Sequence, residues 1–169
     1  MCSNDSFSGR PGVYEVVGGE LQRISVGDRF TSPQGIAYLN DRLYVADYSV
    51  GIFRVNLEMG QTHLLKGWEG VLLLGIDGLM PYRNGLIAIQ NGMAPPRVIF
   101  VELLTPSQIG TVVTLESNHP DYNDQTLGFV ENDTLFYMAN SPWPLFGSNA
   151  DSTLRKPSII LGLPLRLEY

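Results

Sequence analysis

The sequence predicts an all-β fold, part of a β-propeller, and three observations support this prediction. A unit at residues 35–47 returns at residues 78–90 and again at residues 128–140. The glycines that open the three units lie about 40 to 50 residues apart, which is a period typical of propeller blades. Each unit has two apolar runs joined by a tight polar turn, as in neighbouring strands, and no stretch of the chain shows sustained helical periodicity.

The elements follow in order. Residues 1–11 are rich in Ser, Asn, Gly and Pro and are expected to form a flexible lead-in. A hairpin is expected over residues 12–26, with Gly18-Gly19 at its turn, because glycine permits the positive φ of a primed turn. About three four-stranded blades then follow, and they are expected at residues 34–66, 77–115 and 127–169.

Three blades and a hairpin make up about half of a common closed ring, here expected to be six-bladed. An open arc leaves apolar faces uncovered and strand edges unpaired, so association of copies through these open edges is expected. Two alternatives remain. The chain is either the C-terminal piece of a longer propeller or a half ring that a second copy completes.

Composition limits the partners. The net charge is −6, and the 11 Lys and Arg residues are scattered, which argues against binding to nucleic acid or to anionic lipid. No apolar stretch is long enough to span a membrane. Cys2 is the single cysteine, so an internal disulfide is excluded. Cysteine usage therefore leaves periplasmic, secreted and cytoplasmic locations open.

The repeats resemble those of the regucalcin/gluconolactonase family of six-bladed propellers. The resemblance covers about residues 33–145. It rests on residues 33–37 with 43–47, on residues 76–79 and on residues 135–140. NHL-type and strictosidine-synthase-like propellers share the same blade pattern. The resemblance implies a hydrolase for lactones or other esters, with one divalent metal in the central tunnel held by carboxylate and amide oxygens. Ca²⁺ is the first expectation, and Zn²⁺ is the second.

Candidate metal ligands lie just before the inner strands and just after the second strands, because these positions share one face of the ring. Asp77 matches the family position and is the first candidate, both as a ligand and as a catalytic residue. Gln34 holds the same place one blade earlier, whereas Leu127 holds the third and cannot bind a metal. Asn91 and Asn140 are further oxygen donors. Asp77, Asn91 and Asn140 are alternatively turn residues, whereas Gln34 departs from the Asn or Asp usual in the family.

Three other residues are candidates. Asp47 ends a second strand and is assigned to the substrate rim, although it can equally cap a turn. His119, in the polar stretch 116–124 expected over the tunnel mouth, is either a general base or a structured loop residue. Trp143 either rims a ligand pocket or closes over a blade edge.

Two classes of function follow. The first is a metal-dependent lactonase or esterase-like hydrolase, or a fragment that retains part of its site. The second is a non-catalytic propeller that binds a small ligand, a sugar or a protein on its tunnel face. A truncated product without independent activity is a third alternative. Asp77, Asn91 and Asn140 favour the enzyme, and Gln34 and Leu127 favour the binding protein.

Overall fold

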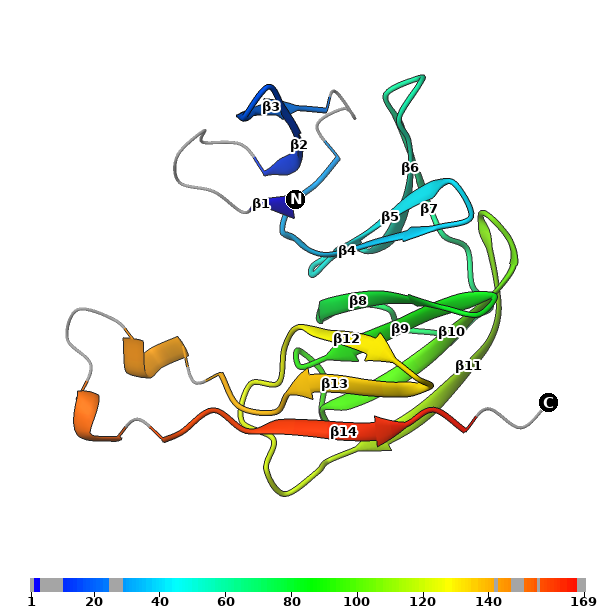
Figure 1. Ribbon diagram of the computed structural model, residues 1–169. Coiled ribbons are helices and arrows are strands. Elements are labelled where there is room, and N and C mark those ends of the chain that lie inside the picture. The colour runs from blue at the N-terminus through cyan, green and yellow to red at the C-terminus, as the bar shows by residue number, and fades with distance from the viewer. Residues whose placement is uncertain are drawn as a thin grey trace.

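The computed structural model describes residues 2–3, 11–24, 29–141, 143–146, 151–154 and 156–166. Four antiparallel sheets follow one another along the chain and are arranged as an open arc (Figure 1). In the described part the only helices are two short 3₁₀ turns, η1 (Trp143–Phe146) and η2 (Ser152–Leu154). The chain is therefore an all-β partial propeller, as its sequence predicts. None of the described helices is long and apolar enough to cross a membrane.

The first sheet contains the predicted hairpin, which is formed by β2 (Gly12–Val17) and β3 (Glu20–Arg23). Its turn residues Gly18 and Gly19 have φ of 60° and 87°, as a primed turn requires. A short strand, β1 (Cys2–Ser3), pairs with β2, so two residues of the expected lead-in belong to the sheet. Residues 4–10 and 25–28 lie outside the described part.

The two complete blades agree with the predicted limits to within a few residues. The first blade consists of β4 (Pro33–Leu39), β5 (Arg42–Asp47), β6 (Gly51–Asn56) and β7 (Gln61–Leu64). The second consists of β8 (Ile76–Tyr82), β9 (Gly85–Gln90), β10 (Arg97–Thr105) and β11 (Gln108–Ser117). In both sheets the strand order follows the chain order, as in a propeller blade.

The third blade differs from the four-stranded prediction. In its described part it has three strands, β12 (Gly128–Glu131), β13 (Thr134–Met138) and β14 (Ile160–Pro164). After β13 the chain leaves the sheet, passes through η1 and η2, and returns as β14. Leu161 and Leu163 of β14 pack against the second blade, which explains the alternation of leucines in the sequence.

Each repeat unit turns as expected. Asn40 and Asp41 have positive φ, as do Asn132 and Asp133, and Arg83 does so in the second blade. Asparagine and aspartate tolerate this conformation better than most residues, because their short polar side chains bond locally. These polar pairs therefore set the tight connection between the inner and second strands.

The inner strands of successive blades lie side by side: β4 contacts β8, and β8 contacts β12. Gly35 allows the closest approach. A Cβ at this position would lie 2.7 Å from the Cβ of Leu79 and 2.8 Å from its backbone nitrogen. The glycine that opens the first unit is thus required by the contact between blades.

Apolar cores fill the spaces between neighbouring sheets. Val13 of the hairpin is buried with Val45 and Phe53 of the first blade. A second cluster joins the first and second blades, and a third joins the second and third. The hydroxyl of Tyr44 donates to the Pro106 carbonyl of the next blade at 3.2 Å. Tyr137, at the same repeat position, donates to Glu116 of the preceding blade, so both tyrosines join blades as predicted.

Candidate functional site

A pocket of about 440 Å³ lies where the inner strands of the first two blades begin. Four of the predicted site residues meet there: Gln34, Asp77, Asn91 and Trp143. The sequence did not single out the other three lining residues, Ser32, Tyr48 and Asp124. The pocket thus draws on the first two blades, the connection from β11 to β12, and η1.

Bulges direct two of these side chains. The pairing of β4 with β5 shifts register between Pro33 and Ile36, and that of β8 with β9 shifts between Ile76 and Gly78. A bulge adds one residue to its strand and re-aims the side chain there. Gln34 and Asp77 occupy these equivalent bulges, which explains why both reach the same pocket.

The Asn91 side chain connects two carboxylates. Its amide nitrogen donates to Asp77 Oδ2 at 3.1 Å and to Asp124 Oδ1 at 3.2 Å. Its own Oδ1 is buried and accepts no hydrogen bond within the described part of the chain. A buried carbonyl oxygen without a donor costs free energy. The site therefore presents two carboxylates that converge on one amide, and one unsatisfied oxygen beside them.

Glycines let the strand ends come together around Asn91. Gly75, with φ of 64°, accepts a hydrogen bond from the Gly92 nitrogen at 3.1 Å, and its own nitrogen donates to the Tyr48 carbonyl at 2.8 Å. A Cβ on Gly75 would lie 2.7 Å from the Gly92 Cα. The segment after β5 is thereby held beside the segment after β9, and Tyr48 comes next to the carboxylates.

The pocket is electrostatically negative. Burial raises the pKa of the Asp124 carboxyl above its ordinary 3.8, and the charge of Asp77 raises it further. Burial also raises the pKa of the Tyr48 phenol, with contributions from Asp124 and then Asp77. No Lys or Arg is among the seven described residues that line the pocket. Such a site favours a cation or a neutral polar ligand over an anion.

Asp124 is the main residue that sequence reasoning missed as an individual candidate. It ends the polar stretch 116–124 that was expected over the tunnel mouth, and this stretch was the available signal. Its φ of 66° is a turn conformation that no local pattern predicted. The next residue, Gln125, is buried and donates to the Gln90 carbonyl at 3.2 Å, which anchors the turn against the second blade.

Asp47 lies outside the pocket and has a structural role. Its carboxylate is fully buried. Oδ2 accepts from the nitrogens of Thr31 at 2.6 Å and Ser32 at 2.9 Å, and Oδ1 accepts from the Ser49 nitrogen at 3.0 Å. These bonds form the cap that was the alternative to a place on the substrate rim, because all these partners are backbone groups.

The same position plays the same part in the other blades. Gln90 donates to two backbone carbonyls in the segment before β8 and accepts from Arg97. Asn140 donates to the Pro157 carbonyl at 2.9 Å and accepts from the Ile159 nitrogen at 2.6 Å. Both polar atoms of the Asn140 amide are therefore engaged by the segment that leads into β14. Asn140, predicted as a metal ligand, is not among the residues that line the pocket.

His119 also lies apart from the pocket. Its Nδ1 accepts from the Asp121 nitrogen at 3.2 Å, and its ring lies 5.7 Å from that of Tyr122. These contacts place it in a structured turn, which was the alternative to a catalytic role. Trp143 does line the pocket, and 65% of its surface is exposed.

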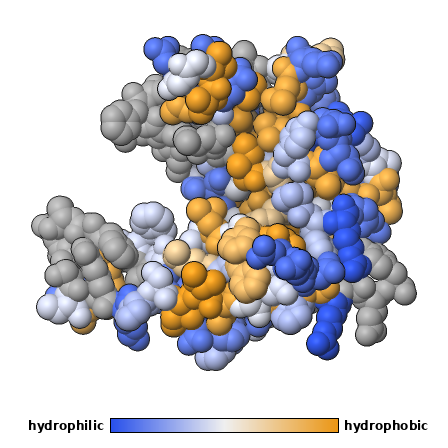
Figure 2. Space-filling view, viewed as in Figure 1, coloured by the Kyte–Doolittle hydropathy of each residue, from blue (hydrophilic) through white to orange (hydrophobic). Residues whose placement is uncertain are grey.

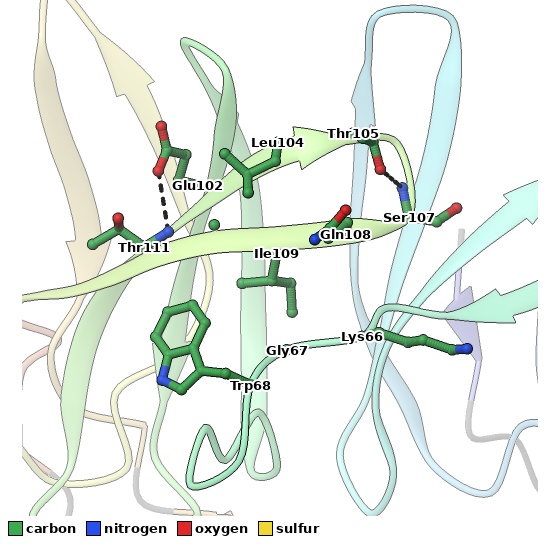
Figure 3. Close-up of a pocket in the computed structure, with 11 residues that line it drawn as sticks. Lys66, Gly67, Trp68, Glu102, Leu104, Thr105, Ser107, Gln108, Ile109 and Thr111 are labelled. Atoms are coloured by element: carbon green, nitrogen blue, oxygen red, sulfur yellow. Dashed lines mark hydrogen bonds between the residues drawn. The ribbon is translucent and has the colours of Figure 1, made fainter.

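A second, more open groove of about 730 Å³ lies between the first and second blades (Figure 3). None of the predicted site residues lines it. Its backbone joins the blades, because the Lys66 nitrogen donates to the Ser107 carbonyl at 3.3 Å and the Ile109 nitrogen donates to the Lys66 carbonyl at 3.0 Å. Glu102 accepts from the Thr111 nitrogen (Figure 3). These backbone groups and the Glu102 carboxylate of the groove thus serve the contact between strands and blades.

The described residues bring few metal-ligating side chains together. Across the described ranges, no cluster of three or more His, Cys, Asp or Glu side chains could hold a metal ion. The pocket offers two carboxylates together with the amides of Asn91 and Gln34. Any cation held there would depend on amide oxygens as well as on carboxylates.

Comparisons with known proteins give the fold. No family model and no curated protein matches the chain. Among solved structures, the chain is similar to the PQQ-bound form of an aldose sugar dehydrogenase from Streptomyces coelicolor, with a TM-score of 0.54 and 16% identity. This match covers 82% of the chain and 46% of that protein, so the chain spans about half its length. A computationally designed protein, Ika8, matches at a TM-score of 0.48 and 13% identity, over 78% of the chain and 37% of the design.

Proposed function

We propose that the pocket binds a divalent cation through Asp77, Asp124 and Asn91, and that the cation-bound chain hydrolyses a lactone or another ester. The observation that carries the proposal is the convergence of two carboxylates on the Asn91 amide, at 3.1 and 3.2 Å. Without a cation, the partial positive charge of the amide nitrogen stands between two negative groups. A cation would neutralise them far more completely.

The residues fit a hard cation. Every donor is an oxygen, which suits Ca²⁺ better than Zn²⁺, since zinc favours histidine and cysteine. A half-turn of the Asn91 amide would direct its unsatisfied Oδ1 towards the carboxylates. Burial raises the pKa of Asp124 and the nearby Asp77 carboxylate raises it further, and a cation would offset both effects. Gln34 is a fourth oxygen donor on the same pocket wall.

The chain's own residues would accept the proton, orient the substrate and donate a hydrogen bond to it. When bound, Ca²⁺ supplies Lewis acidity to an ester carbonyl and lowers the pKa of a water. Asp124 is our candidate for the proton acceptor in place of His119, because its carboxylate lines the pocket whereas His119 lies outside it. Trp143 and Gln34 would orient the substrate at the rim. Tyr48, whose pKa is raised, would keep its proton and could donate a hydrogen bond to the substrate.

A second candidate is a non-catalytic binding site for a sugar or another small polar ligand. Its support is the exposed Trp143 ring beside Tyr48, Ser32 and Gln34, because aromatic faces with nearby hydrogen-bonding groups suit polyhydroxyl ligands. PQQ, which the Streptomyces neighbour binds, is a poor candidate here. It carries carboxylates, and two carboxylates with no lining Lys or Arg would repel it.

The test is a calorimetric titration of Ca²⁺, then Zn²⁺, into the wild-type chain and into Asp77→Asn. Glu58→Gln is a matched control, because Glu58 is an exposed carboxylate on the turn after β6. We expect one Ca²⁺ site in the wild type and in the control, and at least a tenfold weaker site in Asp77→Asn. A screen of lactones and esters with and without Ca²⁺ follows. A folded wild type that binds neither metal would contradict the proposal and favour the sugar-binding alternative.

A further inference from the structure

The two ends of the arc carry apolar sheet faces that no described neighbour covers. Inside the arc, each sheet buries one face against the next through a cluster of aliphatic and aromatic side chains. At the ends this series stops. Figure 2 shows apolar surface both over the β12–β14 sheet and beside the β2–β3 hairpin.

The outer face of the third blade is aromatic. Leu135, Tyr137 and Leu163 point towards the second blade, so alternation directs their neighbours outward. Phe129 pairs with Phe136, and their rings stack at 5.5 Å. Phe129 is 58% exposed and Ile160 is 67% exposed. The face is completed by Glu131, Thr134, Met138, Gly162 and Pro164, which share it through the strand register.

The outer face of the first sheet is its counterpart. Val13 is buried against the first blade, so Tyr14 and Val16 lie on the opposite face. The register pairs Val16 with Leu21 and Tyr14 with Arg23. Val16 is 66% exposed and Leu21 is 56% exposed. This face is smaller than that of the third blade, but it is likewise apolar at its centre.

We infer that these two faces bind each other between two copies of this chain, and that two such contacts close a ring. The contact would continue the blade-to-blade interface that the arc already repeats three times. The charges agree: on the described residues of these faces, Arg23 is the one cation and Glu131 the one carboxylate.

Closure of the ring sets a geometric requirement for the second copy. Each copy offers both faces, and a contact between unlike faces closes into a ring of two if the arc spans half a turn. This inference does not depend on any metal or on the activity of the pocket.

The first test is the mass of the chain in solution, measured by sedimentation over a wide range of concentrations. A dimer in reversible exchange with monomer is expected. Phe129→Glu places a charge in the apolar contact and should raise the dimer dissociation constant at least tenfold. Met59→Glu is the control, because Met59 is similarly exposed on a turn between β6 and β7. Circular dichroism confirms that each variant is folded.

A mixing experiment identifies the faces. Val16→Glu and Phe129→Glu should each weaken self-association. Mixed together they should form a heterodimer through the one intact pair of faces, one from each variant. A folded wild type that stays monomeric overturns the inference. So does an average mass that keeps rising beyond that of a dimer as the concentration increases, because a closed ring of two has a fixed mass. If Val16→Glu associates as tightly as the wild type, the third-blade face binds itself or something else, and the proposed pairing is wrong.

Discussion

Two sets of positions recur in the blades, and they behave differently. One lies at or just after the end of the second strand of each repeat and holds Asp47, Gln90 and Asn140, all buried and all hydrogen-bonded to backbone groups. The other lies at the start of the inner strand and holds Gln34 in β4, Asp77 in β8 and Leu127 directly before β12. Residues of the first set are polar in every blade because each of them binds backbone groups of a neighbouring segment. We call these three residues, Asp47, Gln90 and Asn140, the clamp. The second set varies, and two of its members line the pocket.

This difference shows which positions of a repeat serve the fold and which serve a ligand site. A polar residue that returns in every unit performs a task that every unit shares, and holding the neighbouring segment is such a task. A ligand pocket is needed once in a ring, so its residues need not repeat. Asp77 and Asn91 differ from their counterparts in the first blade, Gln34 and Tyr48, although all four lie in one pocket.

The largest expected effect is at the clamp. Asp47→Ala leaves three part-buried backbone nitrogens without their acceptor and removes a fully buried side chain, so it should lower the free energy of unfolding by about 3 kcal/mol. Urea unfolding followed by circular dichroism measures the change. A loss below about 0.5 kcal/mol would show that the clamp does not hold the first blade.

The next effect is at the contact between inner strands. Gly35→Ala forces a methyl group to within 2.8 Å of the Leu79 backbone nitrogen and should cost about 2 kcal/mol. Gly70→Ala is the comparison, because nothing lies within 4 Å of a Cβ built there, although its φ of 91° adds some backbone strain. If Gly70→Ala costs more than Gly35→Ala, close approach of the blades is not what requires Gly35.

Asn91→Asp tests whether the pocket residues, unlike the clamp residues, bind a cation. This change replaces the shared donor with a third carboxylate, so the metal-free chain should lose about 1 to 2 kcal/mol through repulsion. Saturating Ca²⁺ should restore most of the loss, because three carboxylates then face one cation. Thermal unfolding with and without Ca²⁺ measures both. Equal destabilisation in the two conditions would argue against a cation at this place.

The smallest effect is a pH dependence. The folded chain holds the proton of Asp124 more tightly than the unfolded chain does, since its pKa is raised. The metal-free wild type should therefore gain stability, relative to Asp124→Asn, as the pH falls from 7 towards the ordinary value of 3.8. The relative gain should stay below about 1 kcal/mol, because the carboxyl is partly exposed. A relative loss on acidification would mean that ionised Asp124 stabilises the fold.

Much of the fold was predictable because the repeat encodes it. The spacing of Gly35, Gly78 and Gly128, with polar turns after each, specified the first two blades almost to their ends. The third blade was less predictable, since residues 141–159 contain short 3₁₀ turns with no periodic pattern. The short strand β1 could not be anticipated, because two residues carry no periodicity.

The site was predictable only in part. Topology placed Gln34, Asp77 and Asn91 on one face, and the pocket brings them together. Asp47 ends β5, and Asn140 lies two residues after β13. Tertiary contacts, which the sequence does not show, decide whether such a side chain points into the pocket or binds nearby backbone groups. Asp124 comes from a loop whose path depends on the buried Gln125 and on a positive φ, which the sequence does not reveal.

The most direct test of the account measures the free energy of unfolding with and without Ca²⁺ in three chains. We predict that Ca²⁺ stabilises the wild type and Asp47→Ala by the same increment, because a ligand of the folded state adds a stability set by its affinity. Asp77→Asn should unfold at nearly the wild-type free energy without Ca²⁺ and gain almost nothing from the metal. If Ca²⁺ stabilises Asp77→Asn as much as the wild type, or stabilises neither chain, the division between clamp and pocket is contradicted.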